Sequence, residues 1–492
     1  MRRTNLLRLS GPLLGSIVYL LLGDVGHAQA AMAGVVTWMA IWWISEAVAL
    51  AVTSLLPLVL FPILGIATMG DTAANYGREI IFLFLGGFLL ALALERSQLH
   101  RRIALRIVSK VGGTGARLVA GMLISSALLS MWMNSTSCTL VMLPIALSLL
   151  DGDGDPALRK KLTVPLLLAV AYGAAIGGMA TPVGTPPNLV FLEIWKGRWP
   201  ERPPIGFGQW MTFGVPMALI FLAIAWALLS KVVFRLPNVH LSPPVEVKAR
   251  LKALGRMSHA ERTAGVIFAL TALLWVTGGD LKFSDSYTLQ GWRERCDLEW
   301  FTDGAVAMFG ALLLFVLPVK GIPTLAETED EGSSSGRPPS LLTWRYAEAK
   351  VPWGILLLFG GGFAIASGIE SSGLAVLLVA QMEHLKHLPP WLLIGSVGAL
   401  VCVLSELGSN TAVASLSLPI LAESAEAWGM DPQYLLIPAT LAATLGFALP
   451  VASPMQAIVF GSGRIPVREM VRTGVWLDLA GIILLTLFFG WR

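Results

Sequence analysis

Two short polar clusters interrupt long apolar stretches of this 492-residue chain, and both carry oxygen-rich side chains. The first cluster is Asn134-Ser135-Thr136 and the second is Ser409-Asn410-Thr411. Hydroxyl and amide oxygens suit a hard cation such as sodium, whereas backbone amides freed at a helix break suit the oxygens of an anion. The two clusters therefore predict a site that holds a small anion with cations beside it.

A proline-containing loop follows each cluster. Pro182-Val183-Gly184-Thr185-Pro186 follows the first cluster, and Pro450-Val451-Ala452-Ser453-Pro454 follows the second. Glycine and proline break helices and so release backbone carbonyls and amides. We therefore expect two half-sites, which are 130–137 with 184–188 and 405–411 with 452–456. Neither contains lysine, arginine or histidine, so a bound anion must bring cations with it.

The same segments belong to an internal repeat. Gly86-Gly87-Phe88 recurs as Gly361-Gly362-Phe363, and Leu143-Pro144-Ile145 recurs as Leu418-Pro419-Ile420. These pairs and the two polar clusters are separated by 275 residues, and the two proline loops are separated by 268. Transporters are often built from repeats inverted in the membrane, with the binding site at broken helices in corresponding positions. The repeat therefore points to the same two half-sites.

The amino-acid composition indicates whether these segments lie in water or in a membrane. Apolar residues make up 55% of the chain and charged residues 13%, whereas soluble domains carry about 25% charged residues. This chain is too apolar for a soluble or disordered protein, and its three cysteines cannot form a disulfide framework. The net charge is only +4 and the basic residues are scattered among the loops, which argues against a nucleic-acid partner. A polytopic protein embedded in the lipid bilayer remains.

Stretches long enough to cross a bilayer need about 20 apolar residues. We predict an all-α polytopic membrane protein made of two inverted repeats, with about 11 transmembrane helices. Their approximate limits are 11–24, 31–45, 47–66, 79–95, 163–180, 208–234, 263–278, 304–319, 352–369, 433–448 and 473–490. Regions 116–150 and 388–424 are each broken by a polar cluster, so we read them as two re-entrant helical hairpins.

The charged loops between the apolar stretches indicate how the chain is oriented in the membrane. Basic loops at 96–117 and 231–262 are expected on the cytoplasmic side by the positive-inside rule. The mixed-charge loop 320–350, with its acidic and serine-rich segment 327–336, is expected to be a flexible connector. The N-terminus has two interpretations: a cleaved secretory signal ending near Ala28-Gln29-Ala30, or a retained first helix. We favour the retained helix, because the next apolar run starts at once.

Four acidic residues lie in or beside apolar segments. Glu46 is expected at a membrane face, and Glu95 and Glu370 are expected to cap helix ends. Glu406 lies beside the second half-site, where it could tune ion binding or carry a proton. Gly360-Gly361-Gly362 lacks the residues of a phosphate loop, and the histidines lack zinc-ligand spacing. We therefore expect no enzyme and no cofactor other than coupling ions.

Five segments of this chain resemble the divalent anion:sodium symporter family, whose members carry dicarboxylates, citrate or sulfate. The resemblance runs from about residue 37 to the C-terminus and rests on segments 42–47, 130–136, 184–188, 409–411 and 459–463. It implies an elevator-type transporter of the plasma membrane, usually a homodimer. The scaffold would be 1–110 and 205–385, and the transport domain 111–204 and 386–470, with 471–492 as a final helix.

The resemblance also implies which residues bind ions and substrate. One sodium ion would be held by Ser130, Asn134, Ser135 and Gly184, and a second by Ser405, Gly408, Asn410 and Ala452. The substrate would meet Ser135, Thr136, Thr185, Pro186, Ser409, Asn410, Thr411, Ser453 and Pro454. Two departures stand out: Asn134-Ser135 replaces the family's Ser-Asn order, and Pro454-Met455-Gln456 replaces its Pro-Pro-Asn. They affect the expected sodium affinity and substrate size.

These expectations combine into one functional hypothesis with several rivals. The hypothesis is a secondary transporter that moves a small divalent anion, such as the C4-dicarboxylate succinate, together with sodium. The rivals on the same fold are a sodium-independent dicarboxylate exchanger and a carrier of sulfate or citrate. An ion channel would need a continuous pore, and a membrane enzyme would need catalytic groups that the sequence does not offer.

Overall fold

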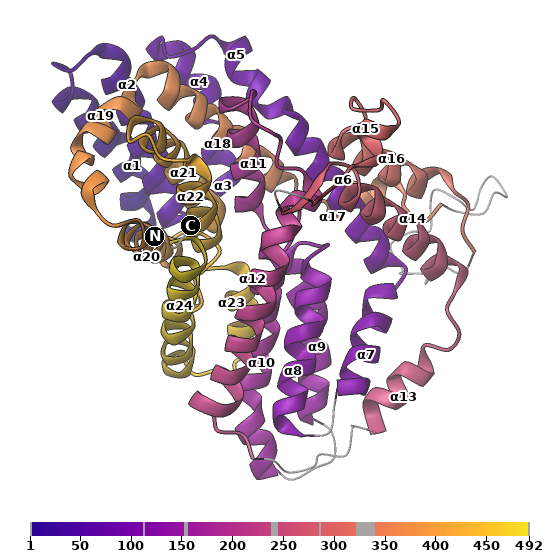
Figure 1. The fold of residues 1–492 in the computed structure, drawn as a ribbon. Coiled ribbons are helices and arrows are strands. Elements are labelled where there is room, and N and C mark those ends of the chain that lie inside the picture. Colours follow the sequence, from indigo (N-terminus) through magenta and orange to yellow (C-terminus); the bar gives the residue numbers. More distant parts are fainter. Residues whose placement is uncertain are drawn as a thin grey trace.

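The computed structural model describes residues 2–111, 114–151, 156–237, 245–284, 287–320 and 340–490. Nearly all of the described chain is helical, and its two strands, β1 (Leu281–Ser284) and β2 (Tyr287–Leu289), form one small antiparallel pair (Figure 1). Among the described residues, seven helices are long and apolar enough to cross a membrane, and further apolar helices are shorter. The predicted all-α membrane architecture is thus confirmed.

The first segment of the chain forms the helices that precede the first hairpin. They are α1 (Arg2–Leu21), α2 (His27–Ser45), α3 (Leu50–Thr53), α4 (Leu56–Leu64), α5 (Met69–Ala74), the 3-10 turn η1 (Asn75–Gly77), α6 (Glu79–Arg96) and α7 (Leu99–Val111). The stretch expected as one span at 47–66 is divided into α3 and α4. Pro57 lies in the first turn of α4, where its missing N–H costs no helical bond, so a new helix begins there.

Both predicted hairpins are present. The first consists of α8 (Gly115–Ser130) and α9 (Ser135–Asp151), followed by α10 (Pro156–Met179) and α11 (Pro186–Arg198). The second consists of α20 (Pro390–Leu407) and α21 (Asn410–Ala427), followed by α22 (Pro432–Ala442) and α23 (Pro454–Gly461). In each half the second pair is one helix broken by the proline loop, as the repeat predicts.

A middle segment and a final helix complete the fold. The middle segment contains α12 (Phe207–Ala227), the π-helix η2 (Leu228–Val233), α13 (Val245–Ala253), α14 (His259–Val276), α15 (Trp292–Arg295), α16 (Asp303–Val316), α17 (Trp344–Lys350), α18 (Trp353–Ser372), α19 (Leu374–Gln381) and η3 (Glu383–His387), and the final helix is α24 (Val467–Phe489). Residues 321–339 of the expected flexible loop, including 327–336, lie outside the described residues.

The span expected at 433–448 ends earlier than predicted. Helix α22 stops at Ala442, and the chain stays non-helical from Ala443 to Ser453. Gly446 adopts a φ of 158°, which side-chain-bearing residues rarely adopt, and Pro450 cannot donate a helical hydrogen bond. The unwound stretch is therefore longer in the second half than the apolar pattern indicates.

Helices α8, α9 and α10 run side by side as one bundle, and α20, α22 and α24 pack together as another (Figure 1). Small residues allow the close approach: a Cβ atom at Gly177 of α10 would lie 2.3 Å from the Ala127 carbonyl oxygen of α8. Helix α23 contacts both α9 and α10, so the broken helix of the second half reaches the first bundle.

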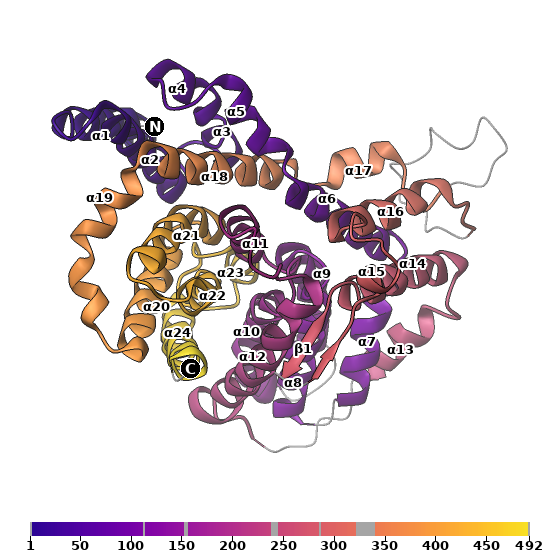
Figure 2. The same cartoon turned by 45° about the horizontal axis from the view of Figure 1, so that its top comes forward.

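The repeated Gly-Gly-Phe segments pack in equivalent ways on α6 and α18. Figure 2 shows α6 beside α16 and α18 beside α21. A Cβ at Gly86 would meet Ala307 of α16 at 2.6 Å, and one at Gly361 would meet the Ser54 carbonyl oxygen at 2.6 Å. The second glycines face the other way. A Cβ at Gly87 would lie 3.7 Å from Val183, and one at Gly362 2.5 Å from the Ser415 hydroxyl.

Candidate functional site

The tip of the first hairpin places two serines against the broken helix. The Ser130 hydroxyl lies 2.7 Å from the Ser135 hydroxyl and donates to the Ala174 carbonyl of α10 at 2.6 Å. Ser135 also contacts the Gly184 carbonyl at 3.3 Å. Both serines are buried. The structure therefore brings together three of the four predicted ligands of the first cation, which are Ser130, Ser135 and Gly184.

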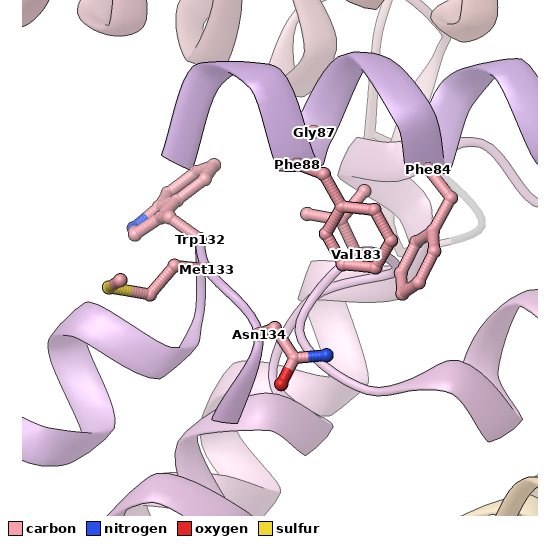
Figure 3. Close-up of a pocket in the computed structure, with 7 residues that line it drawn as sticks. All are labelled: Phe84, Gly87, Phe88, Trp132, Met133, Asn134 and Val183. Carbon is pink, nitrogen blue, oxygen red and sulfur yellow. The ribbon is translucent and has the colours of Figure 1, made fainter. Parts of the chain in front are cut away.

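Asn134, the fourth predicted ligand, makes a different contact. Its Oδ1 atom accepts a hydrogen bond of 2.8 Å from the backbone N–H of Thr136, in the first turn of α9. The amide thus caps the helix N-terminus, as short polar side chains commonly do. Figure 3 shows Asn134 at a small pocket lined by the hairpin tip, Val183 and the α6 residues Phe84, Gly87 and Phe88. Asn134 therefore lies where the hairpin meets α6.

Buried hydrogen bonds fix the first proline loop. The Thr181 hydroxyl donates to the Met131 carbonyl of the hairpin tip. Asn188 donates to the carbonyls of Gly178 at 3.1 Å and Thr181 at 2.8 Å, while its buried Oδ1 has no partner among the described residues. Gly184 packs tightly, since a Cβ there would lie 2.5 Å from the Gly178 carbonyl oxygen. Asn188 lies in the predicted half-site 184–188, but the predicted ion ligands and substrate contacts do not include it.

The predicted anion-contacting residues of this half lie at helix N-termini. Thr185 is the N-cap of α11, its side chain is buried, and Pro186 is the first residue of that helix. Ser135 and Thr136 are the first two residues of α9. Helix N-termini carry unsatisfied N–H groups and a partial positive charge, so both ends favour a negatively charged ligand.

The second hairpin repeats the arrangement with its own side chains. The Ser405 hydroxyl lies 2.7 Å from Asn410 Oδ1 and donates to the Ala443 carbonyl at 2.6 Å. Gly446 lies close to both Ser405 and Ala452. A Cβ atom added at Gly446 would lie 3.6 Å from the Ser405 carbonyl oxygen and 3.5 Å from Ala452 Cβ. Gly408 ends α20 just before the N-cap of α21. Among the predicted ligands of the second cation, Asn410 thus contacts Ser405 directly, Gly408 lies in the same hairpin turn, and Ala452 is linked to Ser405 through Gly446.

The anion-contacting residues of the second half also lie at helix starts. Ser409 is the N-cap of α21, which begins with Asn410 and Thr411. Ser453 caps α23, and Pro454 is the first residue of that helix. The Ser453 hydroxyl donates to Gln456 Oε1, whereas the buried Gln456 Nε2 has no partner among the described residues. Gln456 lies in the predicted half-site 452–456, but the predicted ion ligands and substrate contacts do not include it.

The four acidic residues that lie in or beside apolar segments have different surroundings in the structure. Glu46 is exposed at the end of α2, and Glu95 and Glu370 lie in the last turns of α6 and α18. Glu370 lies 3.8 Å from Arg198. Glu406 is different, because its carboxylate accepts the backbone N–H groups of Ala448 at 2.7 Å and Leu449 at 2.9 Å. It therefore fixes the unwound stretch beside the second half-site.

Ion pairs join α11 to the start of α6. Arg78 lies 2.8 Å from Glu193, and Lys196 lies 2.7 Å from Glu79. At the end of α11, Arg198 pairs with Glu426 at 2.6 Å and with Glu423. The Glu426 pairing lowers the pKa of that carboxyl, since the hydrogen bond from Arg198 outweighs the cost of burial. The α11 members of these pairs lie in the C-terminal half of the helix, whereas its predicted site residues lie at the N-terminus.

Comparison with known proteins identifies the family of this chain. The profile of the sodium:sulfate symporter transmembrane region matches residues 21–492. The chain is 34% identical to a sodium-dependent dicarboxylate transporter of Staphylococcus saprophyticus, over 97% of this chain and 89% of that protein. It is 36% identical to the transporter of the same name from Staphylococcus aureus, over 98% and 90% of the two chains.

A solved structure resembles the fold at low sequence identity. The YdaH transporter of Alcanivorax borkumensis superposes with a TM-score of 0.55 and 14% identity, over 85% of this chain and 86% of that one. That likeness concerns the fold alone. Taken with the profile and the relatives, it identifies a multi-pass plasma-membrane protein rather than an enzyme. The chain therefore belongs to the sodium:sulfate symporter family of membrane transporters, the divalent anion:sodium symporters that its motifs resemble.

Proposed function

We propose that this protein is a secondary active transporter that moves a small divalent anion, a C4-dicarboxylate such as succinate, together with sodium. One observation carries the proposal. In each half a buried hairpin serine bonds a carbonyl of the broken helix, Ser130 to Ala174 and Ser405 to Ala443. The relatives named as sodium-dependent dicarboxylate transporters support both the cation and the class of anion.

The cations would lie at these two serines. We assign one sodium ion to Ser130, Asn134, Ser135 and Gly184, and the other to Ser405, Gly408, Asn410 and Ala452. Hydroxyl, amide and backbone carbonyl oxygens are ligands that hard cations prefer, and broken helices expose such carbonyls. The contacts of Ser135 with Gly184 and of Ser405 with Asn410 support the assignment.

The anion would lie between the two hairpin tips. We assign its contacts to Ser135, Thr136, Thr185, Pro186, Ser409, Asn410, Thr411, Ser453 and Pro454. These residues begin or cap four helices, α9, α11, α21 and α23, whose N-terminal N–H groups can bind carboxylate oxygens. Two sodium ions beside the anion would neutralise it, so transport without sodium would leave a charged substrate uncompensated in a medium of low dielectric.

Movement across the membrane would follow an elevator mechanism in a homodimer. The transport domain would be 111–204 and 386–470 with the final helix 471–492, sliding against a scaffold of 1–110 and 205–385. Glycines support this division, because Gly87 faces Val183 and Gly362 faces Ser415 across the proposed boundary. Glycine carries no side chain, so the two domains can approach each other closely at these positions.

A second candidate is a sodium-independent dicarboxylate exchanger. Asn134 favours it, since the amide oxygen expected to bind the first cation caps Thr136 instead. Uptake of labelled succinate into liposomes distinguishes the two. Uptake driven by an inward sodium gradient, in vesicles without internal dicarboxylate, supports symport. Uptake that requires internal dicarboxylate and ignores sodium supports exchange, and competition by sulfate and citrate reports the anion class.

A further inference from the structure

Two acidic side chains from different helices, which hydrogen-bond each other through a shared proton, hold three successive backbone amides of the unwound stretch 443–453. Glu406 of α20 accepts the N–H groups of Ala448 and Leu449, at 2.7 and 2.9 Å. Asp478 of α24 accepts the N–H of Phe447 at 3.3 Å and is buried. Backbone N–H groups released by a helix break inside a membrane must find acceptors within the protein. The two acids supply those acceptors.

The repeat shows that the first half makes the same two connections with different groups. Residue 131 corresponds to 406 and residue 181 to 449, by the spacings of 275 and 268. In the first half the Thr181 hydroxyl donates to the Met131 carbonyl. The hairpin tip is therefore tied to the same point of the broken helix in both halves, once by a neutral carbonyl and once by a carboxylate.

The second connection meets the broken helix at an equivalent point in both halves. Residue 179 corresponds to 447 by the spacing of 268. In the first half the Trp210 indole N–H of α12 donates to the Met179 carbonyl at 3.0 Å, and in the second half Asp478 of α24 accepts from the Phe447 N–H. Helices α12 and α24 each follow the broken helix of their half but begin 260 residues apart, so the two side chains do not occupy matched positions. In each half the following helix thus holds this point, through a carbonyl acceptor in the first half and a carboxyl acceptor in the second.

The hydrogen bonds made by Glu406 and Asp478 fix a backbone stretch that contacts Ser405. Glu406 is the next residue in the chain, and the stretch it holds begins at Ala443, whose carbonyl accepts from the Ser405 hydroxyl at 2.6 Å. The same stretch ends at Ala452, which lies near Ser405 through Gly446. The hydrogen bonds to Glu406 have the short distances of charge-assisted bonds, which are about twice as strong as neutral ones, so Ala448 and Leu449 are held more firmly than their first-half counterparts.

We propose that Glu406 and Asp478 are positioning residues for the second cation site, which hold residues 447–449 so that the Ala443 carbonyl and Ala452 face Ser405. The proposal rests on the sodium site assigned above. Among the described residues, the other titratable groups near the pair are Cys402 of α20 and Tyr172 of α10, whose hydroxyl donates to the Phe447 carbonyl at 3.4 Å. Neither is a cation, so the backbone amides carry the interaction.

Three substitutions test the proposal through the half-saturating sodium concentration of succinate uptake in proteoliposomes. Glu406→Gln replaces one carboxylate oxygen by an NH₂ group, which cannot accept the hydrogen bond of the backbone N–H that it faces. The half-saturating sodium concentration should therefore rise by about tenfold or more. Asp478→Leu removes an acceptor and should raise it too. Asp478→Asn keeps the oxygen that accepts from Phe447 and can donate to Glu406, so it should stay within about twofold of wild type.

Controls separate positioning from a general loss of structure. Glu383→Gln changes an exposed acid and should leave sodium dependence as in wild type. If Glu406→Gln had the same half-saturating sodium concentration as wild type, the proposal would be overturned. The same holds if Asp478→Asn and Asp478→Leu changed that concentration equally. If Glu406→Gln does not fold, the two Asp478 variants decide. If wild-type uptake ignores sodium, the proposed symport fails itself, which the wild-type measurement reveals before any variant is compared.

Discussion

Ser405 Oγ lies 2.7 Å from Asn410 Oδ1, across the break between α20 and α21, and the same hydroxyl donates to the Ala443 carbonyl of the broken helix. One small side chain therefore joins the end of one hairpin arm, the start of the other and the unwound stretch. Ser130 joins Ser135 and Ala174 in the first half by the same pattern.

Removing the Ser405 hydroxyl should weaken sodium binding selectively. Ser405→Ala deletes one oxygen ligand and leaves the Ala443 carbonyl without its donor, so we expect a loss of about 1–3 kcal/mol at that site. The half-saturating sodium concentration of uptake should rise about tenfold. Ser417→Ala, whose hydroxyl only bonds Val413 within α21, is the matched control and should behave as wild type.

Adding one methyl group at Gly184 should damage the first half-site. A Cβ there would lie 2.5 Å from the Gly178 carbonyl oxygen, so Gly184→Ala must push α10 and the loop apart. We expect a destabilisation of about 1–3 kcal/mol and loss of sodium-dependent uptake. Gly461→Ala provides the comparison, because nothing lies within 4 Å of its Cβ. Equal uptake by the two alanine variants would contradict the tight packing.

A reversible cross-link should stop an elevator movement. Gly87 and Val183 lie on opposite sides of the proposed boundary, and their Cβ atoms would be 3.7 Å apart, close to the mean for disulfides. Gly87→Cys with Val183→Cys, in a Cys296→Ser background, should lose uptake on oxidation and regain it on reduction. Cys138 and Cys402 are buried and can remain.

The matching control lies inside the proposed transport domain. A Cβ at Gly398 would be 3.9 Å from Ala442 Cβ, and both residues belong to the second hairpin and its broken helix. Gly398→Cys with Ala442→Cys should therefore form a disulfide and retain uptake. Continued uptake by the oxidised 87–183 pair would rule out a relative movement at that boundary.

A buried ion pair at the start of α14 should make stability depend on pH. Arg102 contacts the Glu261 carboxylate at 2.5 and 3.0 Å. Burial raises the pKa of Glu261, but hydrogen bonds from Arg102 and Ser258 lower it more, so the net shift is downward. This contribution is complete above the ordinary glutamate pKa and is lost as the pH falls through the lower folded-state value.

Thermal unfolding in detergent measures that contribution. The Tm of the wild type should fall as the pH drops below the usual glutamate range. Glu261→Gln leaves Arg102 buried without a counter-charge, so it should cost about 3–5 kcal/mol at neutral pH and remove this part of the pH dependence. A variant whose Tm changes with pH as the wild type does would place the titration elsewhere.

The hairpins and half-sites were predictable because the polar clusters recur at one spacing within apolar stretches, which is the pattern of a duplicated re-entrant hairpin. The early end of α22 was not predictable from hydropathy, since residues 443–449 are mostly apolar although Gly446 adopts a non-helical φ of 158°. Asp478 was overlooked because it is one acid in a long apolar helix.

The orientation of Asn134 also could not be read from residue order. The swap of amide and hydroxyl suggested only an altered first cation site, whereas the structure adds that the amide oxygen caps α9 while Ser135 contacts Gly184. Side-chain contacts of this kind depend on how the hairpin tip turns, and the turn is fixed by packing against α10 rather than by the local sequence.

Electron cryo-microscopy of the protein in sodium and succinate tests the central claim most directly. We predict one dicarboxylate between the two hairpin tips, touching Thr136 and Thr411, with a cation at Ser130 and another at Ser405. Succinate bound only against the scaffold helices, or at the hairpin tips without cations at the two serines, would contradict the proposed symport site.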